Sequence, residues 1–207
     1  MSGYSILLFV HVSGAILIFT GIGTLLFGVA ALRLAKTVEQ VRAIARPMMF
    51  GRKIGLEHIS VIDVLTTAGV VLTAASGLYM ATNWGFGRGW IEAAIASFAL
   101  MAPVGPFVIN PRLRAIRSAA DAARPGPPDG NLLARTHDPL LTAALLSVTT
   151  WLVGIVFLMT TKPSLAASVI AMLIALVVGL AASLAVSRLD SMGRHKTTAN
   201  IESASRR

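Results

Sequence analysis

The chain has 207 residues, of which 55% are hydrophobic and only 13% are charged, and its net charge is +9. A soluble domain usually carries about 25% charged residues, so this composition excludes an ordinary soluble protein. The absence of cysteine excludes disulfides, thiol catalysis and iron–sulfur clusters. The basic residues flank apolar blocks, which is typical of a membrane protein and not of one that binds nucleic acid. We expect the lipid bilayer as partner, and no nucleic acid.

Five nearly uncharged stretches are each about 20 residues long, which is enough to cross a bilayer. They are continuously apolar and do not alternate, so they predict helices and not a barrel. The predicted fold is an all-α membrane protein, a bundle of five transmembrane helices in one domain, residues 1–190. The expected spans are residues 4–32, 58–81, 91–109, 139–160 and 165–187, followed by a disordered tail, 191–207. No basic residue precedes the first span, so we expect a retained helix and not a signal peptide.

Local signals lie between the spans. Residues 33–53 read as a helical extension of the first span or as an amphipathic helix lying on the membrane, with apolar positions at Leu34, Val38, Val41, Ala45 and Met48. Prolines 103 and 106 predict a kink in the third span, and Asn110-Pro111 is expected to end it. Asp138 followed by Pro139 predicts the start of the fourth helix, with Asp138 as its N-cap. Trp84 and Trp90 suit an interfacial aromatic belt.

The orientation follows from the basic residues. The segments after the first, third and fifth spans hold 16 of the 18 lysines and arginines, and the other side holds only Arg88 and Lys162. By the positive-inside rule, the N-terminus is expected outside and the C-terminus in the cytoplasm.

Small residues form stripes that favour close helix packing. The stripe of the first span comprises His11, Gly14, Ile18, Gly21, Leu25 and Gly28. The stripe of the second span comprises Ser60, Asp63, Thr67, Val70, Ala74, Gly77 and Ala81. The fifth span places Ala171, Ala175 and Gly179 at four-residue spacing. We expect all three stripes to face the interior of the bundle.

His11 is a candidate cofactor ligand. It shares its stripe with Gly14 and Gly21, and the missing side chains of these glycines would leave room for a flat ring such as haem b or a quinone. A hydrogen-bonded histidine that only packs between helices would show the same pattern.

Asp63 and Arg112 are candidate intramembrane polar residues. An acid inside a span is costly and marks a site by default. The expected partners of Asp63 are Arg112 at the end of the third span, or Arg52 and Lys53. Asp63 then forms a structural ion pair or is a hydrogen-bonded protonated acid; proton transfer or ligand contact is the alternative.

His58 and His137 share a depth at the cytoplasmic side, and each has an acidic neighbour, Glu57 and Asp138. Together they could bind a divalent metal, or both imidazoles could bind haem iron. Capping and headgroup contact are the alternative. His11 lies about 20 Å from the depth of His58 by helix rise, so these two histidines cannot share one haem.

Two short motifs carry a family resemblance: Phe9-Val10-His11-Val12-Ser13-Gly14-Ala15 with Gly21-Ile22-Gly23, and Asn110-Pro111-Arg112-Leu113-Arg114. They resemble an uncharacterised family of bacterial integral membrane proteins, over residues 1–190. This resemblance implies a helical bundle in the bacterial inner membrane. A more distant likeness is to the copper-resistance protein D and membrane protoporphyrinogen oxidase families, in which a first-helix histidine is a haem ligand. Only His11 carries over, because the basic residues and proline-flanked motif of the oxidases are absent here.

No phosphate loop, dinucleotide motif, zinc motif or nucleophile elbow is present, so the sequence does not decide whether the protein is an enzyme. Three functions remain open. The protein could hold haem b or contact a quinone in a redox context. It could be a non-enzymatic accessory subunit with a membrane-protein partner or a second copy of itself. It could also be a small transporter or proton path through Asp63.

Overall fold

The computed structural model describes residues 3–48 and 61–205, and their side chains as far as residue 190. This part of the chain is helical and contains no strand. The helices are α1 Gly3–Leu34, α2 Val38–Met48, α3 Val61–Trp84, α4 Gly89–Met101, the π-helix η1 Gly105–Ile109, α5 Asn110–Ala122, α6 Gly130–Thr136, α7 Pro139–Thr161 and α8 Leu165–Ser205.

Five helical segments are long and apolar enough to cross a membrane, which confirms the predicted five-helix bundle in the described residues. They are Gly3–Leu34, Val61–Trp84, Gly89–Ala122, Gly130–Thr161 and Leu165–Asp190. Large apolar side chains remain exposed on their outer faces, for example Phe27 and Phe107. Such faces need lipid as their solvent. The orientation of the termini stays a prediction.

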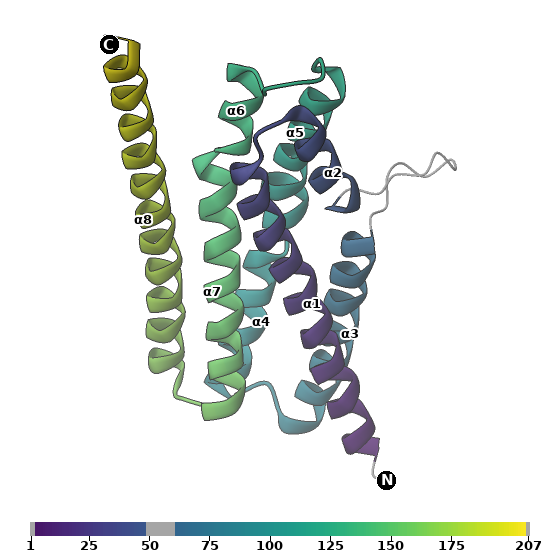
Figure 1. Ribbon diagram of the computed structural model, residues 1–207. Helices are drawn as coiled ribbons and strands as arrows, with labels where there is room; N and C mark the ends of the chain where they lie inside the picture. The colour runs from purple at the N-terminus through teal and green to yellow at the C-terminus, as the bar shows by residue number, and fades with distance from the viewer. Residues whose placement is uncertain (1–2, 49–60, 206–207) are drawn as a thin grey trace.

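The bundle consists of two helix pairs joined by α4 (Figure 1). α1 packs along α3, α7 packs along α8, and α4 contacts both α7 and α8. The start of α1 and the connections 85–88 and 162–164 lie at one end, which we call the sparsely charged end. α2, α6 and the end of α5 lie at the other, which we call the basic end.

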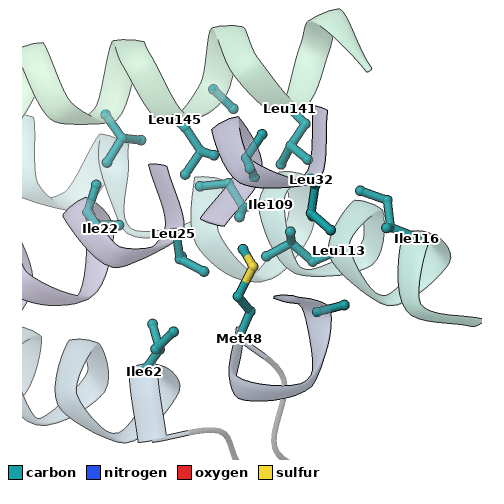
Figure 2. Close-up of a cluster of buried hydrophobic side chains, with 14 of the residues drawn as sticks. Ile22, Leu25, Leu32, Met48, Ile62, Ile109, Leu113, Ile116, Leu141 and Leu145 are labelled. Atoms are coloured by element: carbon teal, nitrogen blue, oxygen red, sulfur yellow. The ribbon is translucent and has the colours of Figure 1, made fainter. Parts of the chain in front are cut away.

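The main apolar core occupies the half of the bundle near the basic end (Figure 2). It combines side chains from α1, α2, α5 and α7, among them Leu32, Met48, Ile116 and Leu141. Met48 lies directly over Gly28, where a Cβ would meet the methionine side chain. α2 is therefore docked on the bundle and covers its basic end.

Of the two alternatives for this segment, the separate amphipathic helix is confirmed as α2, and its apolar face packs on the bundle. Val38, Val41, Ala45 and Met48 are buried, whereas Leu34 is 79% exposed and belongs to the end of α1. The Thr37 hydroxyl accepts a hydrogen bond from Gln40 N at 3.3 Å, and the Gln40 side chain accepts one from Lys36 N at 2.7 Å. This reciprocal pair begins the helix in the manner of a capping box.

Two polar contacts attach α2 to the segment after α5. Val38 N donates to Gly126 O at 2.9 Å, and Gly126 N donates to the Glu39 carboxylate at 3.1 Å. Gly126 has φ +123°, which favours glycine. Arg42 donates to the carbonyls of Ala120 at 2.8 Å and Ala123 at 2.6 Å, so it satisfies carbonyls at the C-terminal end of α5.

Docking of α2 should weaken in acid. Hydrogen bonds from its own backbone N–H, the Thr37 hydroxyl and Gly126 N–H lower the pKa of Glu39 from its ordinary value of 4.5, and the charge of Arg42 adds to them. Because the folded pKa is the lower one, this stabilisation is complete above pH 4.5 and is lost as the pH decreases through the folded pKa. We expect the protection of the Val38 amide against hydrogen exchange to decrease over this acidic range. If Glu39→Gln lost the same protection over the same pH range, titration of Glu39 could not be the cause.

The third span differs from its prediction. It does not end at Asn110-Pro111 but continues as one helical segment to Ala122. Pro103 and Pro106 cannot donate backbone hydrogen bonds, and the expected disturbance takes the form of the π-helix η1, where Asn110 N bonds to Gly105 O. Pro111 occupies the first turn of α5, where its missing N–H costs little.

The last helix is longer than expected. α8 continues to Ser205, beyond the expected end of the span at 187. The segment 191–205, which the sequence predicts to be disordered, has a helical backbone here. Disorder of the tail stays a prediction.

Candidate functional site

His11 lies on α1 and is held by α3. Its Nδ1 atom is 3.0 Å from Thr73 O and 3.2 Å from Ser76 Oγ. A carbonyl oxygen can only accept, so Nδ1 carries the proton and donates it. The Ser76 hydroxyl donates its own proton to Leu72 O, which leaves its oxygen free to accept from His11. The tautomer of His11 is thereby fixed, with the lone pair on Nε2.

Nε2 of His11 has no hydrogen bond within the described part of the chain. It is also not among the fully buried polar atoms without a partner, which are Arg33 Nε, Thr73 Oγ1 and Ser147 Oγ. Nε2 therefore reaches the surface of the α1–α3 pair. An imidazole lone pair at an apolar surface is an unused acceptor and a strong ligand.

Helix α3 fills the space beside the α1 glycines near His11, and the His11 ring fills the space beside Gly77 of α3. A Cβ on Gly14 would lie 2.8 Å from Thr73 N, and one on Gly69 would lie 2.7 Å from Gly14 O. A Cβ on Gly21 would collide with the Thr66 hydroxyl, and one on Gly77 would lie 2.9 Å from the His11 ring. The room that the sequence analysis reserved for a cofactor beside Gly14 and Gly21 is thus occupied by the neighbouring helix.

The stripe of α1 is confirmed, since Gly14, Ile18, Gly21 and Leu25 are buried. The stripe predicted for α3 is confirmed only in part. Ala81 is buried and Gly77 faces the His11 ring, but Thr67 and Ala74 are exposed, and the other buried residues, Ile62, Gly69 and Ser76, lie one position earlier than the predicted ones. The helix is rotated because Gly69 is the residue that allows the backbones to touch. Sequence reasoning therefore missed Thr73 and Ser76, whose three-residue spacing on that face was the available signal.

The stripe of α8 is confirmed at its glycine. Gly179 is buried against α7, where a Cβ would lie 2.6 Å from Ser147 Cα. Gly154 of α7 lies opposite Ala175, with 3.1 Å between its added Cβ and that of the alanine. Small residues thus bring α7 and α8 together as they do α1 and α3.

The structure places Asp63 on α3 and Arg112 on α5. Asp63 lies half-buried in the first turn of α3, at the basic end, where a negative charge suits the helix dipole. Arg112 pairs with Asp138, with 3.1 Å between Nε and Oδ2, and donates to Val108 O at 2.9 Å. Arg52 and Lys53, the other partners expected for Asp63, lie outside the described residues, so the partner of Asp63 stays a prediction.

Asp138 is the predicted N-cap of α7. Its Oδ1 atom accepts from Leu140 N at 2.8 Å and from Leu141 N at 3.4 Å. Because Oδ2 binds Arg112, one carboxylate both starts α7 and ties it to α5.

Arg33 was missed by the sequence analysis. Its side chain is only 10% exposed and donates from Nη1 to Asp190 Oδ2 at 2.9 Å and from Nη2 to the Thr142 hydroxyl. This contact links the end of α1 to the start of α7 and to α8 at Asp190. The residue looked like one of many flanking arginines, so nothing in the sequence distinguished it.

His137 ends α6, and its Nδ1 donates to Leu133 O at 3.1 Å. His58 lies outside the described residues, so the proposed His58–His137 site stays a prediction. Within the described ranges, no group of three or more histidine or acidic side chains is placed to hold a metal.

A family model described as predicted integral membrane protein (DUF2269) matches residues 5–163. The chain belongs to this family. The resemblance expected from the two short motifs is thereby confirmed. No curated protein and no solved structure matches the chain. The match covers the His11 site and ends after α7, so α8 lies outside it.

Proposed function

We propose that this DUF2269 protein is a redox-associated protein of the bacterial inner membrane that holds haem b or a quinol against Nε2 of His11. The observation that supports it is the hydrogen bond from Nδ1 to Thr73 O, which fixes the ring and leaves the lone pair on Nε2. A ligating histidine usually donates its other ring N–H to a carbonyl or carboxylate in this way.

Haem b and a quinol share one requirement. Haem iron accepts the imidazole lone pair, and a quinol hydroxyl donates a hydrogen bond to it. Either group would supply electron-transfer chemistry that the side chains here lack. A protonated Nε2 could bind neither haem iron nor a quinol hydroxyl through a lone pair. Because the Thr73 contact keeps the proton on Nδ1, it prepares His11 for either ligand.

The ring would lie on the lipid-facing side of the α1–α3 pair and not between the helices. Gly14 and Gly21 already contact α3, and Gly77 faces the imidazole. The exposed side chains Leu8 and Val12 adjoin His11 on α1 and offer an apolar surface. A group dissolved in the bilayer can approach such a surface laterally. With 16 of the 18 basic residues on the opposite side, the positive-inside rule supports an outer location for His11.

An absorption spectrum tests the haem form. Protein purified in detergent from haem-replete cells should show a Soret band, and His11→Asn should abolish it. Asparagine keeps a donor near the position of Nδ1, so the Thr73 contact survives while the ligand is lost. His137→Asn is the matched control and should leave the band unchanged.

A short-chain quinol tests the other form. It should bind the wild type, and His11→Asn should weaken binding by about tenfold, the value of one hydrogen bond. Wild-type protein that shows no Soret band and binds no quinol would refute the proposed function.

A further inference from the structure

Three aromatic side chains gather at the sparsely charged end. Trp84 stacks on Tyr4 with 6.1 Å between ring centroids, and Trp90 meets Trp84 edge-on at 5.6 Å. They come from the start of α1, the end of α3 and the start of α4. We call these three rings, of Tyr4, Trp84 and Trp90, the aromatic platform. Trp90 is only 8% exposed, so packing holds the platform in place.

Both basic residues of this end converge on the platform. Lys162 Nζ lies 4.6 Å from the Trp84 centroid and 5.8 Å from that of Trp90, and Arg88 Cζ lies 5.8 Å from that of Trp84. They come from two separate connections of the chain. Because both charges contact one indole, they lie no farther apart than about a Debye length at 0.1 M salt, ~10 Å.

The two cations lack an anion. Within residues 3–48 and 61–190, neither Arg88 nor Lys162 forms an ion pair; the side-chain ion pairs there include Arg33–Asp190, Arg112–Asp138 and Arg117–Asp121. Both side chains are exposed. Two like charges on one ring repel each other, and an anion between them would replace that repulsion with two attractions.

The backbone at Lys162 adds an independent observation. Its φ is 48° and its ψ is 53°, and it is the one non-glycine residue with positive φ in the described part of the chain. It ends α7, where glycine or asparagine is usual, because a side chain in this conformation is disfavoured. Strained residues of this kind concentrate at binding sites. Lysine here directs an ammonium onto the tryptophans.

We propose that Arg88 and Lys162 bind the phosphate of an anionic phospholipid in the adjoining leaflet, with the indoles of Trp84 and Trp90 beneath it. Tryptophan and tyrosine favour headgroup depth, which is where the phosphate lies. Guanidinium binds phosphate oxygens in a bidentate geometry, and lysine adds a point charge. A zwitterionic lipid offers the same phosphate, but its own ammonium is repelled by the two cations. The site should therefore prefer a net negative headgroup.

Native mass spectrometry of the full chain in detergent tests this site. Phosphatidylglycerol should bind roughly tenfold or more tightly than phosphatidylcholine with the same acyl chains, as expected for charge-assisted hydrogen bonds. Arg88→Gln and Lys162→Gly should each remove most of this preference. Arg114→Gln, an exposed arginine of the basic end, is the charge-matched control and should retain it.

Lys162→Gly also separates binding from folding. Glycine suits φ 48°, so the melting temperature should stay level or rise while the lipid preference is lost, and Lys162→Arg should restore the preference. Equal binding of both lipids by the wild type, or an unchanged preference in Lys162→Gly, would overturn the proposal. Displacement of the lipid by millimolar inorganic phosphate would overturn the lipid assignment in favour of a free-anion site.

Discussion

Gly69→Ala should destabilise the protein by about 2–3 kcal/mol, as overpacking of a tight contact does. The added methyl would lie 2.7 Å from Gly14 O and 2.8 Å from Ile18 N. Two of its three nearest atoms are backbone, so rotation of a side chain cannot relieve the contact and the two helices must separate. Thermal or denaturant unfolding in mild detergent, followed by circular dichroism, measures the loss.

Gly23→Ala is the matched control. Gly23 lies in the same helix pair, but nothing lies within 4 Å of its added Cβ. This variant should be neutral or more stable by up to about 1 kcal/mol, since alanine is the better helix former. Equal losses in the two variants would show that the α1–α3 contact is not as close as described. His11→Asn, which leaves both glycines intact, should retain most of the stability.

Asp190→Asn should cost about 2–4 kcal/mol, slightly less than the usual cost of breaking a buried ion pair because the carboxylate is 26% exposed. It leaves the Arg33 guanidinium in a nearly buried position without a counter-charge, because asparagine offers only a neutral amide oxygen beside the Thr142 hydroxyl. The end of α8 should detach first. Hydrogen exchange along α8, together with the unfolding midpoint, would detect this.

Asp121→Asn provides the comparison. Asp121 pairs with Arg117 one turn away at 3.6 Å and is 62% exposed, so its removal should cost less than about 0.5 kcal/mol. The double variant Arg33→Met with Asp190→Leu should recover much of the loss, since an apolar pair avoids the desolvation of two charges. A double variant weaker than Asp190→Asn would contradict this reasoning.

Hydropathy and periodicity predicted the five helices and the packed face of α1, but only part of the packed face of α3. On α1, the glycines at 14, 21 and 28 repeat on one face, so the sequence indicates a single face for close packing. On α3, positions 62, 69 and 76 and positions 63, 70 and 77 have the same spacing, and both sets contain small residues. Which face packs depends on the shape of the partner helix, which one sequence does not contain.

Helix caps could be predicted from the sequence, whereas ion pairs between distant residues could not. Asp138-Pro139 is a local signal, and the predicted N-cap of α7 is confirmed. The acids that pair with Arg112 and Arg33 are distant in sequence, so the sequence pattern predicted neither pair. The candidate site was likewise half predicted, because His11 lies in a recognisable stripe whereas Thr73 and Ser76 come from the opposing helix.

The ion pair between Arg33 and Asp190 has a consequence for synthesis. Arg33 leaves the ribosome 157 positions before its carboxylate partner. Chains fold from the N-terminus as they are made, so the first four spans must be inserted while this guanidinium still lacks Asp190. α7 and α8 are joined by a short turn and can pair at once, and their pairing brings Asp190 to α1. The final span would therefore complete the assembly, and a chain truncated before Asp190 would be a natural target for membrane quality control.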